Sequence, residues 1–493
     1  MPFLIENIAR IAFAILLVLI LGNGILIMAA IARRQRRERY FRRLDAMRKE
    51  FAPTVAGVLE GKIGYAVGLT TLARVSGLDR MVLLERLLLT NKPPEEQLPT
   101  LARLCEDLGL VKAWESRLTG RIDPEILREG LVTRQGLFDR VARLGYIIRA
   151  QSAENLGLIR HRASWRLLVG ALDDKHQDLQ TVAARALAAI QEPESFPLLV
   201  ERMHRVLLDP ESALSLRTIK SALIQFPISN APHLLPSLRH SHRRIRFLAT
   251  DIIREMAERE VGGDPDYVLD PKIFGGEMAE TFLTLLPFDE NPDVRARSAP
   301  LIGYLGDPRS TAVLLTLLQD AEWFVRLHSV RALARRKYLP QASRVAERLT
   351  DSHWMVREAS ARALLAYGRQ GVDQLVAHFL STDDRYSREQ IADEMQRAGL
   401  IPTVLQEFAS EPGSQSRELI NQLAQMGKTS YIVSYLESDA DHDVQKKFVE
   451  DFGGQKDPQI RAWVRRLTRQ DADPILRSLA LNTLGVALSR GET

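Results

Sequence analysis

Cysteine is almost absent from this chain of 493 residues, where Cys105 stands alone. A single cysteine excludes an intramolecular disulfide and also a zinc site built from several cysteines. Aromatic residues are scarce as well, at 6%, while Ala, Leu and Arg dominate the second half and favour helix over strand. The composition therefore predicts an all-α protein without covalent cross-links.

The sequence motifs of common catalytic and metal sites are also missing. Neither a G-x-S-x-G nucleophile elbow nor an H-E-x-x-H zinc motif occurs. Residues 57–63 approach a phosphate-binding loop, but the glycines are one residue too close and Ile63 stands where a magnesium-binding Ser or Thr belongs. His240 and His242 come nearest to a metal site, without further ligands at metal-binding spacing. We therefore expect no enzymatic activity, no cofactor and no metal.

One long apolar run lies near the N-terminus. Residues 11–32 cover 22 positions without a charge, which at ~1.5 Å per residue matches a hydrocarbon layer of ~30 Å. Seven arginines follow directly within Arg33–Arg43, and the positive-inside rule places such a flank in the cytoplasm. The run predicts a single transmembrane helix in the inner (plasma) membrane, with residues 1–10 outside and the rest of the chain in the cytoplasm.

A cleaved signal peptide is the alternative interpretation of this run, because Ala30 and Ala32 form an A-x-A sequence. However, signal peptides have apolar cores of only about 7–15 residues, and the arginines after the site would resist translocation. These features favour an uncleaved anchor. Within the span, the amide of Asn23 needs a hydrogen-bond partner, which is either a membrane partner's helix or its own backbone.

Positive charge is concentrated at the same end. The formal net charge is +5, but residues 1–50 hold ten Lys/Arg against four Asp/Glu, which leaves 57 basic and 58 acidic residues beyond them. A duplex-binding protein would be expected to spread its excess Lys and Arg along a binding face. The distribution therefore argues against nucleic acid as a partner, and Arg33–Arg43 is explained by topology together with contact to anionic lipid.

Beyond about residue 143 the chain repeats itself. Asp289, Asp320 and Asp351 are 31 residues apart, and each is followed by Val after five positions, Arg after six and Ser after nine. The matching columns are Val294, Val325 and Val356; Arg295, Arg326 and Arg357; and Ser298, Ser329 and Ser360. With less fidelity the frame extends to Arg143, Asp174, Asp209, His240, Thr382, Glu411, Asp439 and Asp471.

Each unit predicts an apolar helix such as 312–318, a polar turn around the Asp, and a second helix such as 325–334. Helical pairs this short bury their apolar faces only by stacking on neighbours. We therefore expect an α-solenoid of about eleven helical pairs. The pattern resembles the HEAT-repeat family, in particular its short, phycobilisome-lyase-like variety, whose units also carry an Asp, a Val-Arg pair and an Ala/Ser step. The resemblance covers roughly residues 143–488.

The predicted organisation follows from these features. Residues 1–10 form a short extracytoplasmic segment, 11–32 the transmembrane helix, 33–50 a basic juxtamembrane helix, 51–142 a helical cap region and 143–493 the solenoid. The interval between His240 and Asp289 is about eighteen residues longer than one repeat, and the Gly/Pro/Asp-rich stretch 261–276 accounts for the difference. That loop is either a partner-binding loop or a tolerated insertion.

The repeated Asp and Arg are first of all candidates for structural roles. An Asp in the turn can cap the second helix, and an Arg six residues later can bridge to the next unit. Positions that differ between units are better candidates for binding. Arg297, Arg331, Arg335 and Arg362 are expected to share one face of the second helices as a local basic patch. Trp323 and Trp354, also 31 apart, are either partner anchors or packing between repeats.

We therefore expect a non-catalytic, membrane-anchored scaffold or adaptor whose cytoplasmic solenoid binds one or more protein partners, themselves membrane-associated, for example in an envelope or polysaccharide synthesis or export system. The HEAT resemblance implies a fold used by scaffolds, adaptors, transport factors and a few enzymes. The alternatives are therefore an enzyme on the same frame, such as a chromophore lyase, and a solenoid that binds nucleic acid.

Overall fold

The computed structural model describes residues 45–75, 80–89, 94–120, 145–209, 214–264, 266–337, 339–411, 415–469 and 473–489, with a few single positions between 23 and 42. Throughout these ranges the regular structure is helical and contains no strand, so the all-α prediction is confirmed there. The predicted span 11–32 lies almost entirely outside the described residues. Among those that are described, no helix is both long and apolar enough to cross a bilayer.

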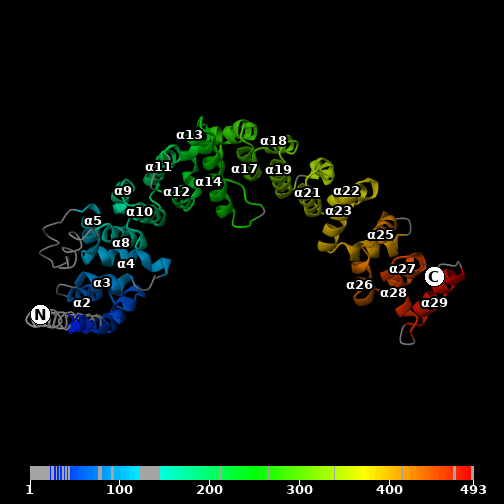
Figure 1. Ribbon diagram of the computed structural model, residues 1–493, viewed down its shortest axis with the longest axis horizontal. Helices are drawn as coiled ribbons and strands as arrows, with labels where there is room; N and C mark the ends of the chain where they lie inside the picture. Colours follow the sequence, from blue (N-terminus) through cyan, green and yellow to red (C-terminus); the bar gives the residue numbers. More distant parts are fainter. Residues whose placement is uncertain are drawn as a thin grey trace, which may run out of the picture. The chain divides into compact units, whose positions relative to one another are not determined.

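The chain folds as two compact units, Met1–Pro227 and Ile228–Thr493. In the first unit, α8 packs between α5 and α10, and α9 packs on α10, so that these helices form a stack (Figure 1). Its helices include 45–59, α2 (Tyr65–Ala73), α3 (Arg80–Leu89), α4 (Leu98–Asp107), α5 (Leu110–Thr119), α8 (Gly145–Leu158), α9 (Trp165–Ala171), α10 (Gln177–Ile190), α11 (Phe196–Leu208) and α12 (Leu216–Leu223).

The start of the first unit has a core of its own. Trp114 is fully buried, and its indole Nε1 donates to Glu85 Oε1 at 2.6 Å. Arg117 binds the same carboxylate at 3.1 Å, so α5 is fastened to α3 by a shared acid. Cys105 is buried beside them, and burial raises the pKa of its thiol. The lone cysteine is thus part of the apolar core of the cap region.

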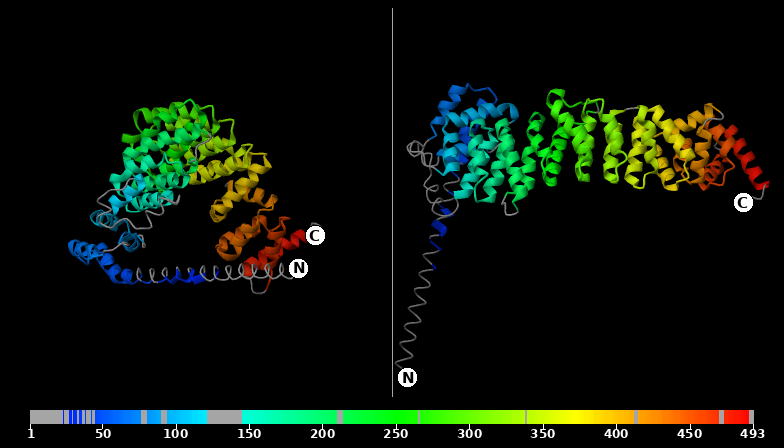
Figure 2. Two further views of the ribbon diagram at one scale, coloured as in Figure 1. Left: turned by 60° about the vertical axis from the view of Figure 1, so that its left-hand side comes forward. Right: turned by 90° about the horizontal axis from the view of Figure 1, so that it is seen from above.

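In the second unit, the second helices of successive pairs lie side by side, as α14, α17, α19 and α21 show (Figure 2). The helices of this unit include α13 (Leu235–Leu238), α14 (Arg243–Val261), α15 (Pro271–Phe274), α16 (Gly276–Glu280), α17 (Pro292–Tyr304), α18 (Ser310–Leu317), α19 (Trp323–Arg336), α20 (Ala342–Ala346), α21 (Trp354–Ala366), α22 (Arg369–Ser381), α23 (Arg385–Arg397), α24 (Ile401–Ser410), α25 (Gln415–Gln425), α26 (Ser430–Ser438), α27 (His442–Phe452), α28 (Pro458–Leu467) and α29 (Pro474–Ser489).

The repeat frame coincides with this alternation of helices. Every frame position predicted from the sequence is followed within a few residues by the second helix of a pair, from α8 after Arg143 to α29 after Asp471. The Val and Ser columns supply the buried side of these helices, where Val325 and Ser329 are both fully buried. A serine fits there because its hydroxyl can donate to a nearby carbonyl, as Ser329 does to Leu314 at 2.5 Å.

Candidate partner-binding site

The repeated Asp and Arg form a ladder of ion pairs between neighbouring repeats. Arg326 on α19 donates from Nε and Nη2 to the two carboxylate oxygens of Asp351, each at 2.7 Å. Its Nη1 donates to the backbone carbonyl of Asp320, the Asp of its own turn, at 2.8 Å. Arg295 binds Asp320 and Arg246 binds Asp289 with the same three-point geometry. The predicted bridge from the Arg to the next unit is confirmed for Arg246, Arg295 and Arg326.

The ladder aspartates also shape the turn before each second helix. An oxygen of Asp351 accepts from the backbone N–H of His353 at 3.0 Å, and the helix is then capped by His353, whose Nδ1 accepts from the N–H of Met355. The expectation that the Asp itself caps the helix is therefore wrong by two residues. Its carboxylate is directed to the turn because the Arg of the previous unit holds it there.

Burial makes these pairs structural. The side chains of Arg326 and Asp351 are 10% and 2% exposed. Burial raises the pKa of the Asp351 carboxyl, but the hydrogen bonds from Arg326 and from the His353 backbone outweigh it and hold that pKa below its ordinary value. A buried ion pair that lost one member would leave an uncompensated charge. The ladder charges are consequently committed within the stack.

His240 occupies the Asp position of the ladder in the turn before α14. Its Nδ1 accepts from the backbone N–H of His242 at 3.0 Å, which is the bond that the aspartates make in later turns. Across the described part of the chain, no group of three His, Cys, Asp or Glu side chains is placed to hold a metal ion. The His240 ring thus has a structural use in the turn.

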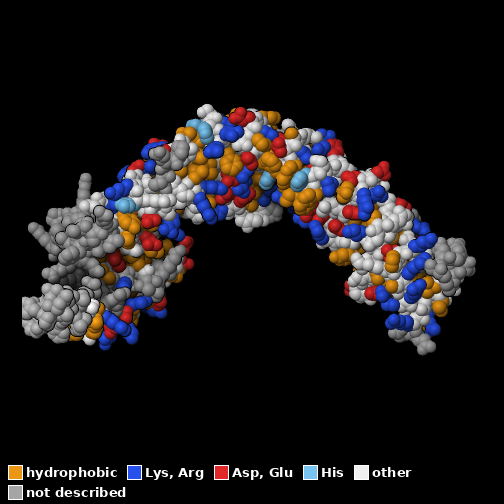
Figure 3. All heavy atoms as spheres, in the orientation of Figure 1, with side chains coloured by type: hydrophobic (Ala, Val, Ile, Leu, Met, Phe, Trp, Pro, Cys, Tyr) orange, Lys and Arg blue, Asp and Glu red, His pale blue; other side chains and the backbone are white. Residues whose placement is uncertain are grey.

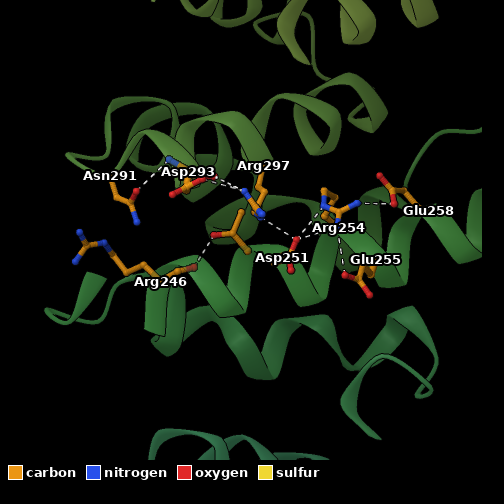
Figure 4. Close-up of polar contacts among 9 residues, drawn as sticks. Arg246, Asp251, Arg254, Glu255, Glu258, Asn291, Asp293 and Arg297 are labelled. Carbon is orange, nitrogen blue, oxygen red and sulfur yellow. Dashed lines mark hydrogen bonds and ion pairs between the residues drawn. The ribbon is translucent and has the colours of Figure 1, made fainter. Parts of the chain in front are cut away.

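Arg297, the first residue of the predicted basic patch, is tied to a buried acid. Its Nε donates to Asp251 Oδ1 at 2.9 Å, and its guanidinium lies 4.2 Å from the ring centre of Phe247. Asp251 is only 5% exposed and is also bound by Arg254 at 2.8 Å. Figure 4 shows Arg297 and Arg254 approaching this carboxylate from α17 and α14. Arg297 therefore joins two helices.

Arg335 holds the inserted loop. Its Nη2 donates to the backbone carbonyls of Asp264 and Tyr267 at 2.8 and 3.0 Å, and its guanidinium lies over the ring of Tyr304. Leu269 in the same loop is buried, and its N–H donates to the carbonyl of Tyr304 at 3.0 Å. The stretch 261–276 is thus bonded to the ends of α17 and α19 at Tyr304 and Arg335, while Val268 within it stays 50% exposed.

Arg362 and Arg331 lie together on α21 and α19, as the sequence frame predicts. Arg362 binds Glu394 of α23 at 2.9 Å and Glu358 of its own helix at 2.6 Å, while its side chain stays 56% exposed. Arg331 is exposed and forms no hydrogen bond or ion pair with any residue that the structure describes. It is the member of the predicted patch whose charge is available to a partner.

A hollow of about 170 Å³ opens between these two arginines. Besides Arg331 and Arg362, it is lined by Glu358 and Met355 and by three alanines, Ala334, Ala359 and Ala363. Figure 3 shows that basic and acidic side chains are intermixed over the visible surface rather than gathered by sign. The expected basic patch is thus largely neutralised by carboxylates, and what remains is a small apolar floor with one uncommitted guanidinium at its rim.

His328 lies on α19 one turn before Arg331. Burial and then the neighbouring charges of Arg331, Arg254 and Arg297 lower the pKa of His328 to about 4. The ring is therefore neutral at pH 7. The three arginines come from three adjacent helices, α19, α14 and α17, and together they disfavour the protonated ring.

The two tryptophans of consecutive turns differ in their surroundings. Trp323 stacks on His353 with ring centres 3.7 Å apart and planes inclined by 8°. The ring centre of Trp354 lies 6.3 Å from that of His353, and Trp354 is 52% exposed. Trp323 thus packs against the next repeat, whereas Trp354 presents an aromatic surface to solvent. Asn23 is helical and exposed, and most of its neighbours lie outside the described residues.

The acids that neutralise the patch escaped prediction. Asp251, Glu358 and Glu394 were not recognised as partners of the arginines. The sequence contained one indication of such a pair. When the repeat frame is continued backward across the insertion to His240, Asp251 falls in the same column as Arg331 and Arg362. An acid in a column of arginines points to a cross-helix pair.

The repeats match a known family. Residues 140–207 and 279–364 match the model for HEAT repeats, which confirms the resemblance for these segments. Solenoids of such repeats present extended surfaces on which other proteins bind. No curated protein matches this chain. A membrane-anchored type is tested by neither comparison.

Solved structures with similar helical stacks include an engineered protein, which has 18% identity and a TM-score of 0.31 and covers 69% of this chain and 95% of its own. Importin beta has 12% identity and a TM-score of 0.38, covering 92% of this chain and 65% of its own. The complex of CpcE and CpcF of phycocyanin lyase from Nostoc sp. PCC7120 has 14% identity and a TM-score of 0.21, covering 59% and 91%. None of these likenesses bears on what this chain binds.

Proposed function

We propose that the chain is a non-catalytic scaffold, anchored in a membrane by residues 11–32, that binds a protein partner at the hollow between Arg331 and Arg362. The observation that carries the proposal is the uncommitted guanidinium of Arg331 beside an apolar floor of alanines and Met355. Specific interfaces combine a small apolar contact with a charged group at its rim. The hollow offers both.

The chemistry of the hollow defines the partner. A volume of about 170 Å³ suits one apolar side chain rather than a drug-sized ligand, whose pockets run from roughly 300 Å³ upward. The partner should carry a carboxylate next to its apolar side chain to bind Arg331, because Arg binds carboxylates through two parallel hydrogen bonds. The partner segment therefore carries an apolar residue followed closely by Asp or Glu.

The anchor would limit the search to proteins at the membrane. We propose an inner-membrane location with the solenoid in the cytoplasm, based on residues 11–32 and the following Arg33–Arg43. Partners in an envelope or polysaccharide synthesis or export system fit this location. A reporter fused to the C-terminus checks the topology, and a periplasmic signal from it would overturn both the location and this choice of partners.

Site-specific crosslinking tests the binding site. A photoreactive residue at position 355 in the hollow should crosslink to a partner in intact membranes, and the same residue at Thr316, exposed on the first helix of a pair, is the matched control. Arg331→Glu should abolish the crosslink at 355, because it repels the partner's acid. Equal crosslinking at both positions, or a crosslink that survives Arg331→Glu, would contradict the proposed site.

A further inference from the structure

The ladder of ion pairs ends at Arg357, because the next aspartate position of the repeat frame holds a different residue. The position 31 residues after Asp351 is Thr382, in the turn between α22 and α23. The helices α21 and α23 still pack against each other as the earlier second helices do. The helix packing that accompanies each earlier rung therefore continues at α21 and α23, while the turn before α23 has a threonine in place of the aspartate.

Thr382 takes the place of the ladder aspartates in its turn. Its Oγ1 accepts from the backbone N–H of Asp384 at 3.2 Å, as the Asp351 carboxylate accepts from His353 two residues on. The hydroxyl reproduces the turn but brings no charge. A threonine in this position thus keeps the local fold and omits the ion pair.

Arg357 correspondingly makes only part of the contacts that Arg326 makes. Its Nη1 donates to the carbonyl of Asp351 at 2.8 Å, the same contact that Arg326 makes to Asp320. Its Nε, the atom with which Arg326 binds the next aspartate, is buried and has no hydrogen-bond partner among the described residues. Leaving a buried donor of a charged group unsatisfied is unfavourable, so the site has an unused capacity for an anion.

We propose that Thr382 is a regulatory phosphorylation site and that its phosphate occupies the ladder position beside Arg357. A protein kinase would transfer the γ-phosphoryl group of a nucleoside triphosphate: the bond from phosphorus to the β-phosphate oxygen breaks, a bond to Thr382 Oγ1 forms, the hydroxyl proton leaves, and the nucleoside diphosphate is released. A phosphothreonine carries about −1.5 to −2 charges at pH 7 and pairs well with Arg.

The turn is open to a modifying enzyme. Thr382 is half-buried, and its neighbours Ser381 and Asp383 are exposed. The carboxylate of Asp384 is engaged by the backbone N–H of Tyr386 at 2.9 Å, which directs it to the start of α23 rather than to Arg357. The added phosphate would tie α21 to the turn before α23 and extend the ladder by one repeat.

The geometric part of the proposal is tested in the full chain with Thr382→Asp. This substitution should slow amide hydrogen exchange in Arg385–Arg397 by about five-fold, which corresponds to roughly 1 kcal/mol. The effect should vanish in the Arg357→Gln background. Ser381→Asp adds the same charge one residue away, at the last residue of α22, and should leave the exchange unchanged. A Thr382→Asp effect that persists without Arg357, or no effect at all, would overturn the proposal.

Modification itself is tested by mass spectrometry of the full chain purified from its own cells in the presence of phosphatase inhibitors. A phosphate on Thr382 that disappears on phosphatase treatment, together with the Arg357-dependent protection of α23, is the expected result. Phosphate absent from Thr382 would overturn the assignment of a modification site even if the Asp variant behaves as expected.

Discussion

Arg326 and Asp351, 25 residues apart in the sequence, are joined by two hydrogen bonds of 2.7 Å each. Arg326 also donates to a backbone carbonyl in the turn of its own repeat. One side chain therefore joins its own helix, the turn before that helix and the turn of the next repeat. This relationship recurs at Arg295 and Arg246 and gives the columns of the sequence their physical meaning.

Removal of one member of a rung should be strongly destabilising. Asp351→Ala leaves the guanidinium of Arg326 buried without its counter-ion, and the free energy of unfolding should fall by about 3–5 kcal/mol. Urea denaturation followed by circular dichroism measures the change. Arg344→Ala, which breaks a pair with Glu347 whose side chains are 46% and 44% exposed, is the control and should cost less than about 1 kcal/mol. Similar losses in both variants would contradict a structural role for the ladder.

His328 should make stability depend on pH below neutrality. Its pKa in the folded chain is about 4, against about 6.5 in an unfolded chain. The unfolded state therefore binds the proton more tightly than the folded state. Protonation of His328 consequently leaves the free energy of unfolding unaffected above pH 6.5 and lowers it progressively as the pH falls toward 4. His328→Gln should flatten the pH dependence of the unfolding free energy in that window. An unchanged profile would show that the imidazole is solvated.

Arg335→Ala should release the inserted loop. The variant loses the bonds to the carbonyls of Asp264 and Tyr267, and cleavage after Lys272 by trypsin should accelerate at least several-fold because the local opening free energy falls. Arg331→Ala is the matched control on the same helix, because Arg331 contacts no loop residue by a hydrogen bond or ion pair among those described. Equal cleavage rates in the two variants would rule out this restraint.

Substitution of each of the two tryptophans should distinguish a role in packing from a role in partner binding. Trp323→Ala removes a ring stacked on His353 and should lower the unfolding free energy by about 1–3 kcal/mol. Trp354→Ala removes a half-exposed ring and should change stability by less than about 0.5 kcal/mol, while weakening the crosslink to a partner. The reverse order of stability losses would assign the packing role to Trp354.

Much of the fold follows from local pattern. The recurrence of Asp, Val, Arg and Ser at 31 residues predicts paired helices, the buried Val column and the bridge from Arg295 to Asp320, because a stack of identical units repeats its contacts at the same interval. The loop 261–276 was located by its length and composition. The course of the loop could not be predicted, because Arg335 holds it through backbone carbonyls, which every residue carries.

The sequence by itself determined that helices stack and that an Arg of the repeated column binds the Asp of the next turn wherever that Asp is present, as at Arg295 and Arg326, since both depend on a periodic contact between neighbours. Only the tertiary structure decided which charges remain available. Arg297 and Arg362 bind Asp251 and Glu394 on other helices, 46 and 32 residues away, whereas Arg331 binds no acid among the residues that the structure describes. A charge is neutralised by whatever side chain packing brings within about 3 Å, and that distance is not encoded in any single repeat.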